Sequence, residues 1–333
     1  MPASRVATAL TVLAGGTFLA STALLVSRWV PYDALPVSSD TWAMATAFTD
    51  LSAAGDLVAL GAAAGAVALR RGRPQVVVAA ACAAAVVAQA LLLGPRWVAA
   101  PPPSAPATSV TVLSLNSELG LADPDSVIAA AAAADVVVLT EVTDPQVRAL
   151  TDAGFARRFP HRTDGSLPGR GADGTAVFSR FPLTGAERLS PALAHQSWVC
   201  AVDVPGLPSP LTVVAVHPDR PHLGGGRWLG EQEDLRAALP TSGPRLLAGD
   251  FNAVASHPTQ RAIVADGWRS TVDEAGAGWV PTYPADSAHL PPLIDIDHVY
   301  VAGALRTTSA RSVRVAGTDH LGLLVTVAVP DRS

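Results

Sequence analysis

The sequence predicts an α/β domain, built on one mixed β-sheet or on two sheets, that follows a membrane-spanning helical region. The first 98 or so residues are mostly apolar, and the whole chain has a mean hydropathy of +0.32 with 49% hydrophobic residues. From about residue 109, short apolar β-branched runs alternate with turns and short helical patterns. With 15% charged residues and two cysteines, the composition excludes a disordered chain, a disulfide scaffold and a zinc site built from several cysteines.

Three apolar runs are each predicted to form a transmembrane helix. They cover residues 6–26, 52–69 and 76–93, and each approaches the roughly 20 residues that cross a bilayer. Trp29, Trp42 and Trp97 lie at the ends of these runs, where interfacial aromatic side chains belong. Asp50 and Asp56 are expected at the outer end of a helix, within reach of lipid headgroups. We therefore expect a membrane region over residues 1–99 with about three transmembrane helices.

The arginines predict the orientation of this region. Arg70, Arg71 and Arg73 cluster between the second and third runs, so that loop is expected in the cytoplasm, and Arg5 agrees. Three spans then place the second domain outside the cytoplasm, in a multi-pass protein of the cell membrane. Two alternatives stay open. The first run resembles a signal peptide, although the two later runs argue against plain secretion. If the second run does not insert, the second domain is cytoplasmic.

A Pro-rich linker is predicted between the two regions. Residues 100–108 read APPPSAPAT, and at roughly 3 Å per residue they would span about 28 Å. A domain over residues 109–331 follows. Its predicted strands are residues 110–115, 136–139, 175–179, 197–204, 211–216, 245–248, 298–301 and 323–329. Helices are predicted at 123–134, 227–239 and 259–265. Only the first pair of strands has the pattern of a βαβ unit.

Polar residues recur at the ends of these buried strands. Strand ends at one edge of a sheet are where α/β proteins build their sites, so the set predicts one site. It offers carboxylates, amides and two imidazoles without a thiol, and this donor set suits Mg²⁺ or Mn²⁺. The residues are Asn116, Glu141, His217, Asp250, Asn252, Asp297, Asp319 and His320.

Other polar residues near these motifs are expected to have lesser roles. Strand alternation would put Asp295 on the same face as Asp297, and His298 should point away. Arg170 and Arg180 flank GADGTAVFS, where they would either contact phosphate or stay solvated. The remaining histidines lie in loop-like segments and are expected at the surface, with His222 and Arg227 near the mouth of the cleft. These histidines are His161, His195, His222, His257 and His289.

The order of these motifs resembles the endonuclease/exonuclease/phosphatase superfamily, which includes DNase I-like nucleases, neutral sphingomyelinases and inositol polyphosphate phosphatases. The matching segments are LSLN, VVVLTEV, GTAVFSRFPL, VVAVHP, GDFNAV, PTYP, IDHVYV and GTDH, over about residues 109–329. HPDRP followed by RWLGEQEDL is closest to a small bacterial membrane-anchored subgroup. The resemblance implies a four-layer sandwich of two mixed β-sheets flanked by helices.

The resemblance also implies which residues would hold a metal ion and a water molecule. Glu141 would bind the metal, with Asn116 and Asp319 completing or supporting its site. Asp250 would orient and activate the attacking water. Asn252 would hold the phosphate and the nucleophile.

The histidines are implied to act on the phosphoryl group. His320 would stabilise charge on the phosphoryl oxygens, and Asp297 would fix its tautomer. His217 would contact the phosphate or assist the leaving group. The implied activity is metal-dependent hydrolysis of a phosphodiester or phosphomonoester.

The substrate class stays open between nucleic acid, a phospholipid headgroup and a small phosphodiester, and no obligate protein partner is predicted. A net charge of −5 argues weakly against a general nucleic-acid binder. The alternative from another class is a catalytically silent, membrane-tethered binding module on the same fold. Such a module would be expected to lose the metal carboxylate or the terminal histidine, and this chain keeps Glu141 and His320.

Overall fold

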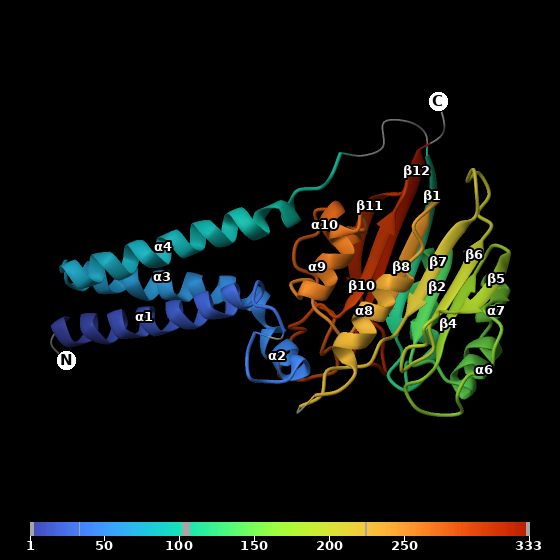
Figure 1. Ribbon diagram of the computed structural model, residues 1–333, viewed down its shortest axis with the longest axis horizontal. Helices are drawn as coiled ribbons and strands as arrows, with labels where there is room; N and C mark the ends of the chain where they lie inside the picture. Colours follow the sequence, from blue (N-terminus) through green and yellow to red (C-terminus); the bar gives the residue numbers. More distant parts are fainter. Residues whose placement is uncertain (1–2, 33, 102–106, 224, 331–333) are drawn as a thin grey trace.

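The computed structural model describes residues 3–32, 34–101, 107–223 and 225–330. A bundle of long helices lies at one end of the molecule and a β-sandwich at the other (Figure 1). The elements that precede the sandwich are α1 (Ala3–Ser27), α2 (Ser39–Thr46), η1 (Thr49–Leu51), α3 (Ser52–Leu69), α4 (Arg73–Leu93) and η2 (Gly94–Trp97).

Helices α1, α3 and α4 form the bundle. Within the described part of the chain, three helical stretches are long and apolar enough to cross a membrane: Ala3–Ser27, Ser39–Leu69 and Arg73–Trp97. They contain the three runs predicted from the sequence. The side chains buried between the helices are small, among them Ala14, Ala59 and Ala63, and small residues let helix backbones approach closely. Large apolar side chains such as Leu91 point outward, as an apolar surrounding would favour.

Asp56 corrects one expectation from the sequence. It is fully buried in the bundle and accepts a hydrogen bond of 3.1 Å from Gln89 Nε2 of α4. The same amide nitrogen donates to Ser52 Oγ at 2.7 Å. A carboxylate among apolar helices needs such polar partners. Asp56 therefore joins α3 to α4 and does not reach toward lipid headgroups.

The second region is a four-layer α/β sandwich of two six-stranded sheets. The first sheet has the strand order β11-β12-β1-β2-β4-β3, and the second has the order β5-β6-β7-β8-β10-β9. The first-sheet strands are β1 (Ala107–Asn116), β2 (Val136–Thr140), β3 (His161–Arg162), β4 (Thr175–Ser179), β11 (Arg306–Val313) and β12 (Gly322–Pro330). The second-sheet strands are β5 (Leu183–Arg188), β6 (Trp198–Val202), β7 (Leu211–Val216), β8 (Arg245–Asp250), β9 (Arg269–Ser270) and β10 (Asp297–Ala302).

Helices cover the outer face of each sheet. The helices that connect the strands are α5 (Pro124–Ala130), η3 (Ala131–Ala133), α6 (Asp144–Asp152), α7 (Phe155–Arg158), α8 (Trp228–Ala238), α9 (Pro258–Ala265) and α10 (Thr271–Glu274). Hydrophobic side chains of α5, α6 and α7 pack on the first sheet, and those of α8 and α9 pack on the second. The predicted helix at 123–134 is present as α5 and η3, with Asp123 Oδ2 accepting from Ser126 N as the N-cap.

Each sheet has one parallel pair of strands at its centre. β1 pairs in parallel with β2, and β7 pairs in parallel with β8. The expectation of a single βαβ unit is therefore wrong, because α8 is the crossover helix of a second one. The second βαβ unit is hard to recognise in the sequence, because a polar segment with prolines and glycines separates β7 from α8. The fold is that of two similar sheets packed face to face.

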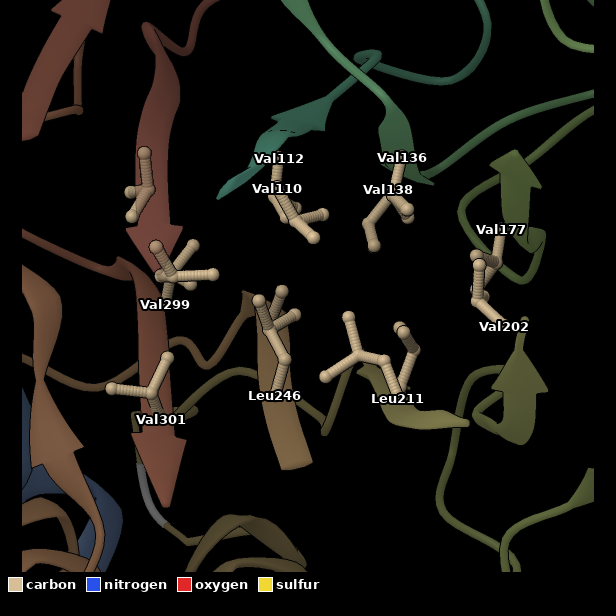
Figure 2. Close-up of a cluster of buried hydrophobic side chains, with 14 of the residues drawn as sticks. Val110, Val112, Val136, Val138, Val177, Val202, Leu211, Leu246, Val299 and Val301 are labelled. Carbon is tan, nitrogen blue, oxygen red and sulfur yellow. The ribbon is translucent and has the colours of Figure 1, made fainter. Parts of the chain in front are cut away.

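The core between the sheets consists mainly of valine and leucine. Figure 2 shows side chains of the first sheet facing those of the second across this layer. Because side chains alternate along a strand, one set fills this layer and the other packs under the outer helices. The labelled core residues are Val110, Val112, Val136, Val138, Val177, Val202, Leu211, Leu246, Val299 and Val301.

The connection between α1 and α3 packs against the second sheet's helices. Tyr32 and Ala43 are buried in the hydrophobic cluster that covers this sheet, and the Tyr32 ring lies edge-on to Trp228 with centroids 5.3 Å apart. His257, expected at the surface, is buried there instead. Its Nε2 donates to the Ala43 carbonyl at 3.1 Å. The connection between α1 and α3 thus belongs to the hydrophobic cluster of the second sheet, whereas the long helices pack in a cluster of their own.

The predicted linker falls partly outside the described residues, which omit 102–106. Before it, Ala100 N donates to the Glu274 carbonyl of the sandwich at 2.8 Å. After it, residues 107 and 108 already belong to β1. Arg96 bonds to Asp50 at 2.7 Å, and its Nη2 lies 3.5 Å from Asp295 Oδ2. Asp295 therefore faces the helical bundle, and the expectation that it shares a face with Asp297 is wrong.

Candidate active site

Strand direction brings the predicted residues to one edge of the sandwich. β1 and β2 run in parallel and end at Asn116 and just before Glu141. β7 and β8 also run in parallel, so His217 and Asp250 come at their shared end. β10 runs antiparallel to β8, and its first residue Asp297 lies opposite Asp250. Ends of parallel strands and starts of antiparallel ones meet at the same edge, which explains the convergence.

Asn116 links carboxylates of the two sheets. Its Nδ2 donates to Glu141 Oε1 at 3.1 Å and to Asp250 Oδ2 at 2.9 Å. Its Oδ1 accepts from Glu118 N at 2.9 Å, and Leu119 N donates to Glu141 Oε2 at 2.9 Å. Both oxygens of Glu141 are therefore held in place. In this arrangement the amide nitrogen of Asn116, not its oxygen, faces the carboxylates.

His320 and Asp297 form a buried ion pair. His320 Nδ1 lies 2.7 Å from Asp297 Oδ2, and His320 Nε2 lies 3.9 Å from Asp250 Oδ2 and 3.8 Å from Asp319 Oδ1. Burial alone would lower the pKa of His320, but the paired Asp297 carboxylate, with Asp250 and Asp319, outweighs it and raises the pKa to about 10. The imidazole is therefore charged at neutral pH and directs an N–H into the cleft.

Asp250 lies at the centre of the site and is almost fully buried. Burial, followed by the repulsion of the Asp297 carboxylate, raises its pKa to about 7. Its Oδ1 accepts from Asn252 N at 2.8 Å, and Asn252 Nδ2 donates to the Pro218 carbonyl at 3.2 Å. Asp250 is thus a carboxylate that can change protonation near neutral pH.

His217 lines the same cleft as His320 and is neutral. Its Nε2 lies 3.9 Å from Glu141 Oε1 and 3.8 Å from Asp250 Oδ2. Burial, followed by the nearby charges of His195 and His320, lowers the pKa of His217 well below its ordinary value. The two histidines at this site therefore differ in charge.

A cleft of about 730 Å³ opens above these groups. Six of the eight predicted residues line it, and Asn116 and Asp297 lie behind them as hydrogen-bond partners. In the described part of the chain, four residues other than glycine have a positive φ, and all four line this cleft. Backbone strain of this kind gathers at functional sites. The four are Glu118, Leu119, Glu141 and Asn252.

Sequence reasoning missed two neighbours of the histidines. His195, expected at the surface, stacks on His217 with ring centroids 4.2 Å apart, and its Nδ1 lies 3.2 Å from Asp173 Oδ1. No motif surrounds His195, so the sequence does not mark it as a site residue. The ring centroid of Tyr283 lies 5.0 Å from that of His320, and its position in the PTYP motif could have identified Tyr283 as a site residue. Arg180 pairs with Asp135 at 2.7 Å. His222 and Arg220 line the cleft.

The donor set fits a hard divalent cation. Burial, followed by the charges of neighbouring carboxylates, raises the pKa of Glu118, and burial is the main cause of the raised pKa of Asp319. Crowded carboxylates of this kind favour a bound cation, and oxygen donors suit Mg²⁺ or Mn²⁺. Ligand atoms of Asp250, Asp297 and His320 also lie within 4.8 Å of one another. There the hydrogen-bonded, protonated His320 would compete with an ion, so the set around Glu141 and Asp319 fits better.

Comparison with known proteins gives one family match. The sequence profile of the Endonuclease/Exonuclease/phosphatase family matches residues 113–320, which include all eight predicted site residues. No curated protein matches the chain.

Solved structures show the same fold. An endonuclease/exonuclease/phosphatase from Beutenbergia cavernae DSM 12333 is 23% identical, with 67% of this chain and 72% of that chain covered and a TM-score of 0.53. D. rerio TDP2 complexed with single strand DNA product is 17% identical, with 66% of this chain and 99% of that chain covered and a TM-score of 0.51. A Bacteroides vulgatus protein of the same description is 15% identical, covers 66% and 98%, and has a TM-score of 0.51.

Proposed function

Because the chain belongs to the Endonuclease/Exonuclease/phosphatase family, we propose that it is a membrane-anchored phosphoesterase that depends on Mg²⁺ or Mn²⁺. The observation that supports this most strongly is the charged His320–Asp297 pair, which faces Asp250 and Asp319 across the cleft. Phosphoester hydrolysis needs a positioned water and donors for the phosphoryl oxygens. This edge of the sandwich provides carboxylates that could position the water and a charged imidazole that could donate to the phosphoryl oxygens.

Glu141 and Asp319 are the proposed ligands of the metal ion. Asn116 supports them by fixing Glu141 through its 3.1 Å hydrogen bond. A divalent ion bound there would supply positive charge for a non-bridging phosphoryl oxygen. The carboxylates of Glu141 and Asp319 are partly exposed, with 18% and 27% of their side chains accessible, so an ion can enter from solvent.

Asp250 is the proposed base. With a pKa near 7 it can orient a water molecule and accept its proton at neutral pH. The water oxygen bonds to phosphorus, the bond from phosphorus to the ester oxygen breaks, and the departing oxygen takes up a proton. Asn252 would hold the phosphate and the water, and its position is fixed by the bond from its N–H to Asp250.

His320 is the proposed donor to the phosphoryl oxygens. Asp297 keeps the proton on Nδ1, which leaves Nε2–H directed at the cleft. A charged donor in a buried site stabilises developing negative charge strongly. His217 would contact the phosphate or assist the leaving group through Nε2, in the neutral tautomer that carries its proton on that nitrogen.

The site is proposed to lie outside the cytoplasm, in a multi-pass protein of the cell membrane. Three apolar helices and the arginines of residues 70–73 support this orientation. Phosphate esters of nucleic acid, of a phospholipid headgroup or of a small molecule are the candidate substrates, and no obligate protein partner is proposed. TDP2 was crystallised with a single strand DNA product, which supports the nucleic-acid candidate. The net charge of −5 argues weakly against the nucleic-acid candidate, because nucleic acids are bound mainly through positive charge.

The test is hydrolysis of a chromogenic phosphodiester by the full-length protein in detergent, with Mg²⁺, with Mn²⁺ and with EDTA. We expect turnover that requires the metal and is lost in His320→Ala. His289→Ala changes an exposed loop histidine and should behave like the wild type. Turnover that persists in EDTA or in His320→Ala would contradict the proposal.

The silent binding module is the alternative if no turnover is found. Melting the full-length protein with and without Mg²⁺ separates the two, because an ion that binds only the folded state raises Tm. No shift at millimolar Mg²⁺, together with no turnover, would favour the silent module. A shift that Glu141→Gln abolishes would support an intact metal site.

A further inference from the structure

The wall of the cleft includes an apolar surface from the membrane region. Met44, Ala47 and Phe48 line the same cavity as Asp250 and His320. Met44 and Phe48 keep 38% and 44% of their surface accessible, although both are large and apolar. These side chains lie in and just after α2, before η1 begins. A polar reaction site thus has one apolar wall, named here the α2 wall and defined as Met44, Ala47 and Phe48.

The α2 wall is fixed to the sandwich by polar bonds. Asp40 is fully buried, and its Oδ2 accepts from His222 N at 3.0 Å. His257 Nε2 donates to the carbonyl of Ala43, which is the residue before Met44. Bonds at two places along a short helix hold it in one position. The wall is therefore a built part of the cleft and not a loose loop near it.

The α2 wall is continuous with the helices that could cross a membrane. α2 follows α1 and leads through η1 into α3, and in Figure 1 it lies where the helical bundle meets the sandwich. Trp97 of η2 and Trp279 of the sandwich line a second, apolar cavity of about 500 Å³ at the same junction. Exposed tryptophans are typical of a membrane–water interface. The cleft therefore opens close to the level at which lipid headgroups would lie.

The charges of the cleft fit one phosphate better than a polyanion. Among the described residues that line it, there are five carboxylates and one arginine, Arg220. A nucleic acid is held by a stripe of basic residues that neutralises successive phosphates. A single phosphate group attached to an apolar chain needs only the local donors at His320 and an apolar surface beside them.

We propose that the phosphate ester hydrolysed here is carried by a membrane lipid, whose apolar part lies against the α2 wall while its phosphate reaches Asp250 and His320. This rests on the proposed phosphoesterase function and adds the substrate class. The wall acts on specificity, because an apolar surface favours a substrate in proportion to the apolar area that it covers.

The test is a series of alkyl phosphates with four, eight and twelve carbons as inhibitors of chromogenic phosphodiester hydrolysis. The full-length protein is held in a phosphate-free amphipathic polymer. We expect inhibition to strengthen with chain length, by about tenfold from butyl to octyl phosphate. In the double variant Met44→Ser/Phe48→Ser this dependence should flatten to less than about twofold. Val264→Ser removes an exposed valine of α9 outside the cleft and should keep the full dependence.

The thermal stabilisation of the protein by the same alkyl phosphates gives a readout that needs no turnover. If the chromogenic ester is not hydrolysed and Mg²⁺ does not raise Tm, but Tm rises with alkyl chain length, the phosphoesterase function fails while binding of a lipid phosphate beside the α2 wall is supported. If hydrolysis occurs but neither readout depends on chain length, the lipid proposal is overturned. A short DNA duplex that inhibits more strongly than dodecyl phosphate would also overturn it, in favour of a nuclease.

Discussion

The two sheets contribute carboxylates to the site that differ in burial. Glu141 and Asp319 come from the first sheet and keep 18% and 27% of their side chains accessible. Asp250 and Asp297 come from the second sheet, with 2% and 0% accessible. The sheets share one layout, with a parallel pair at the centre of each. This difference in burial supports the proposed division of roles, in which accessible carboxylates bind an ion from solvent and buried ones control protons.

Hydrogen bonds across the two sheets join these carboxylates into one site. Asn116 of the first sheet bonds to Asp250, and His320, which precedes β12 of the first sheet, bonds to Asp297. Neither sheet holds a complete set of groups. The comparison therefore predicts that changes in second-sheet carboxylates alter turnover and its pH dependence, whereas changes in first-sheet carboxylates alter the need for metal.

The largest effect is expected for Asp250→Asn. Loss of the proposed base should lower kcat by about 10³-fold or more. Because the folded-state pKa of Asp250 is raised to about 7, its ionised form costs stability above that pH, and the variant should not lower Tm at pH 8 in EDTA. Kinetics and thermal melting check this. Asp152→Asn, at the exposed end of α6, is the matched control. A lower Tm would mean that Asp250 acts mainly as a structural residue.

Asp297→Asn should have the next largest effect. Without the carboxylate, the pKa of His320 should fall from about 10 toward or below its ordinary value, because burial then dominates. We expect kcat to drop by about 10²- to 10³-fold at neutral pH. An NMR titration of the His320 ring measures the pKa directly. An unchanged titration in the variant would break the assignment of Asp297 to proton control.

Glu141→Gln is expected to change the metal requirement. The Mg²⁺ concentration that gives half-maximal turnover should rise by about 10- to 100-fold, because a charged ligand oxygen is lost. At saturating Mg²⁺ the loss of kcat should be smaller than in Asp250→Asn, and the His320 titration should stay as in the wild type. A metal titration of turnover decides the matter. If the Mg²⁺ concentration for half-maximal turnover stays the same while the pKa of His320 changes, the proposed difference in role between first-sheet and second-sheet carboxylates is wrong.

The smallest effect concerns His257, a buried group of the second sheet's outer core. Its Nδ1 accepts from Val254 N and its Nε2 donates to Ala43, so the ring is neutral. Burial lowers its pKa to about 3 from 6.5. The unfolded chain therefore binds the proton first, and stability is lost as pH falls from about 6.5 toward 3, by at most about 1.4 kcal/mol per pH unit.

Chemical denaturation of the wild type and of His257→Gln between pH 7 and pH 4 measures this loss. The glutamine cannot titrate, so the variant should lose less stability over the same range. Equal losses in the two proteins would show that His257 is not the group responsible.

The central strands could be predicted from the sequence because their apolar runs are short and bounded by turns. The edge strands β5 and β11 could not, since exposed polar residues alternate along them and leave no apolar run, as in Leu183–Arg188. The strands β3 and β9 have two residues each and carry no periodic signal.

The site residues were accessible to sequence reasoning because each lies at the end of a buried strand or within a few residues of one. Their differences in burial were not, since the exposure of Glu141 and the enclosure of Asp297 depend on how the sheets pack. The stacking of His195 on His217 joins loops far apart in the chain. The same holds for the α2 wall, because nothing in the sequence of residues 39–48 shows that Met44 would line the same cleft as Asp250.

The division of roles between accessible and buried carboxylates is tested most directly by Mn²⁺ binding, followed by electron paramagnetic resonance of the free ion. We would titrate the full-length wild type, Glu141→Gln and Asp297→Asn side by side. The account predicts that Mn²⁺ binds the wild type and Asp297→Asn with similar affinity and binds Glu141→Gln about 10- to 100-fold more weakly. If Asp297→Asn loses the ion and Glu141→Gln retains it, the ion lies at the buried Asp250, Asp297 and His320 cluster, and the account is contradicted.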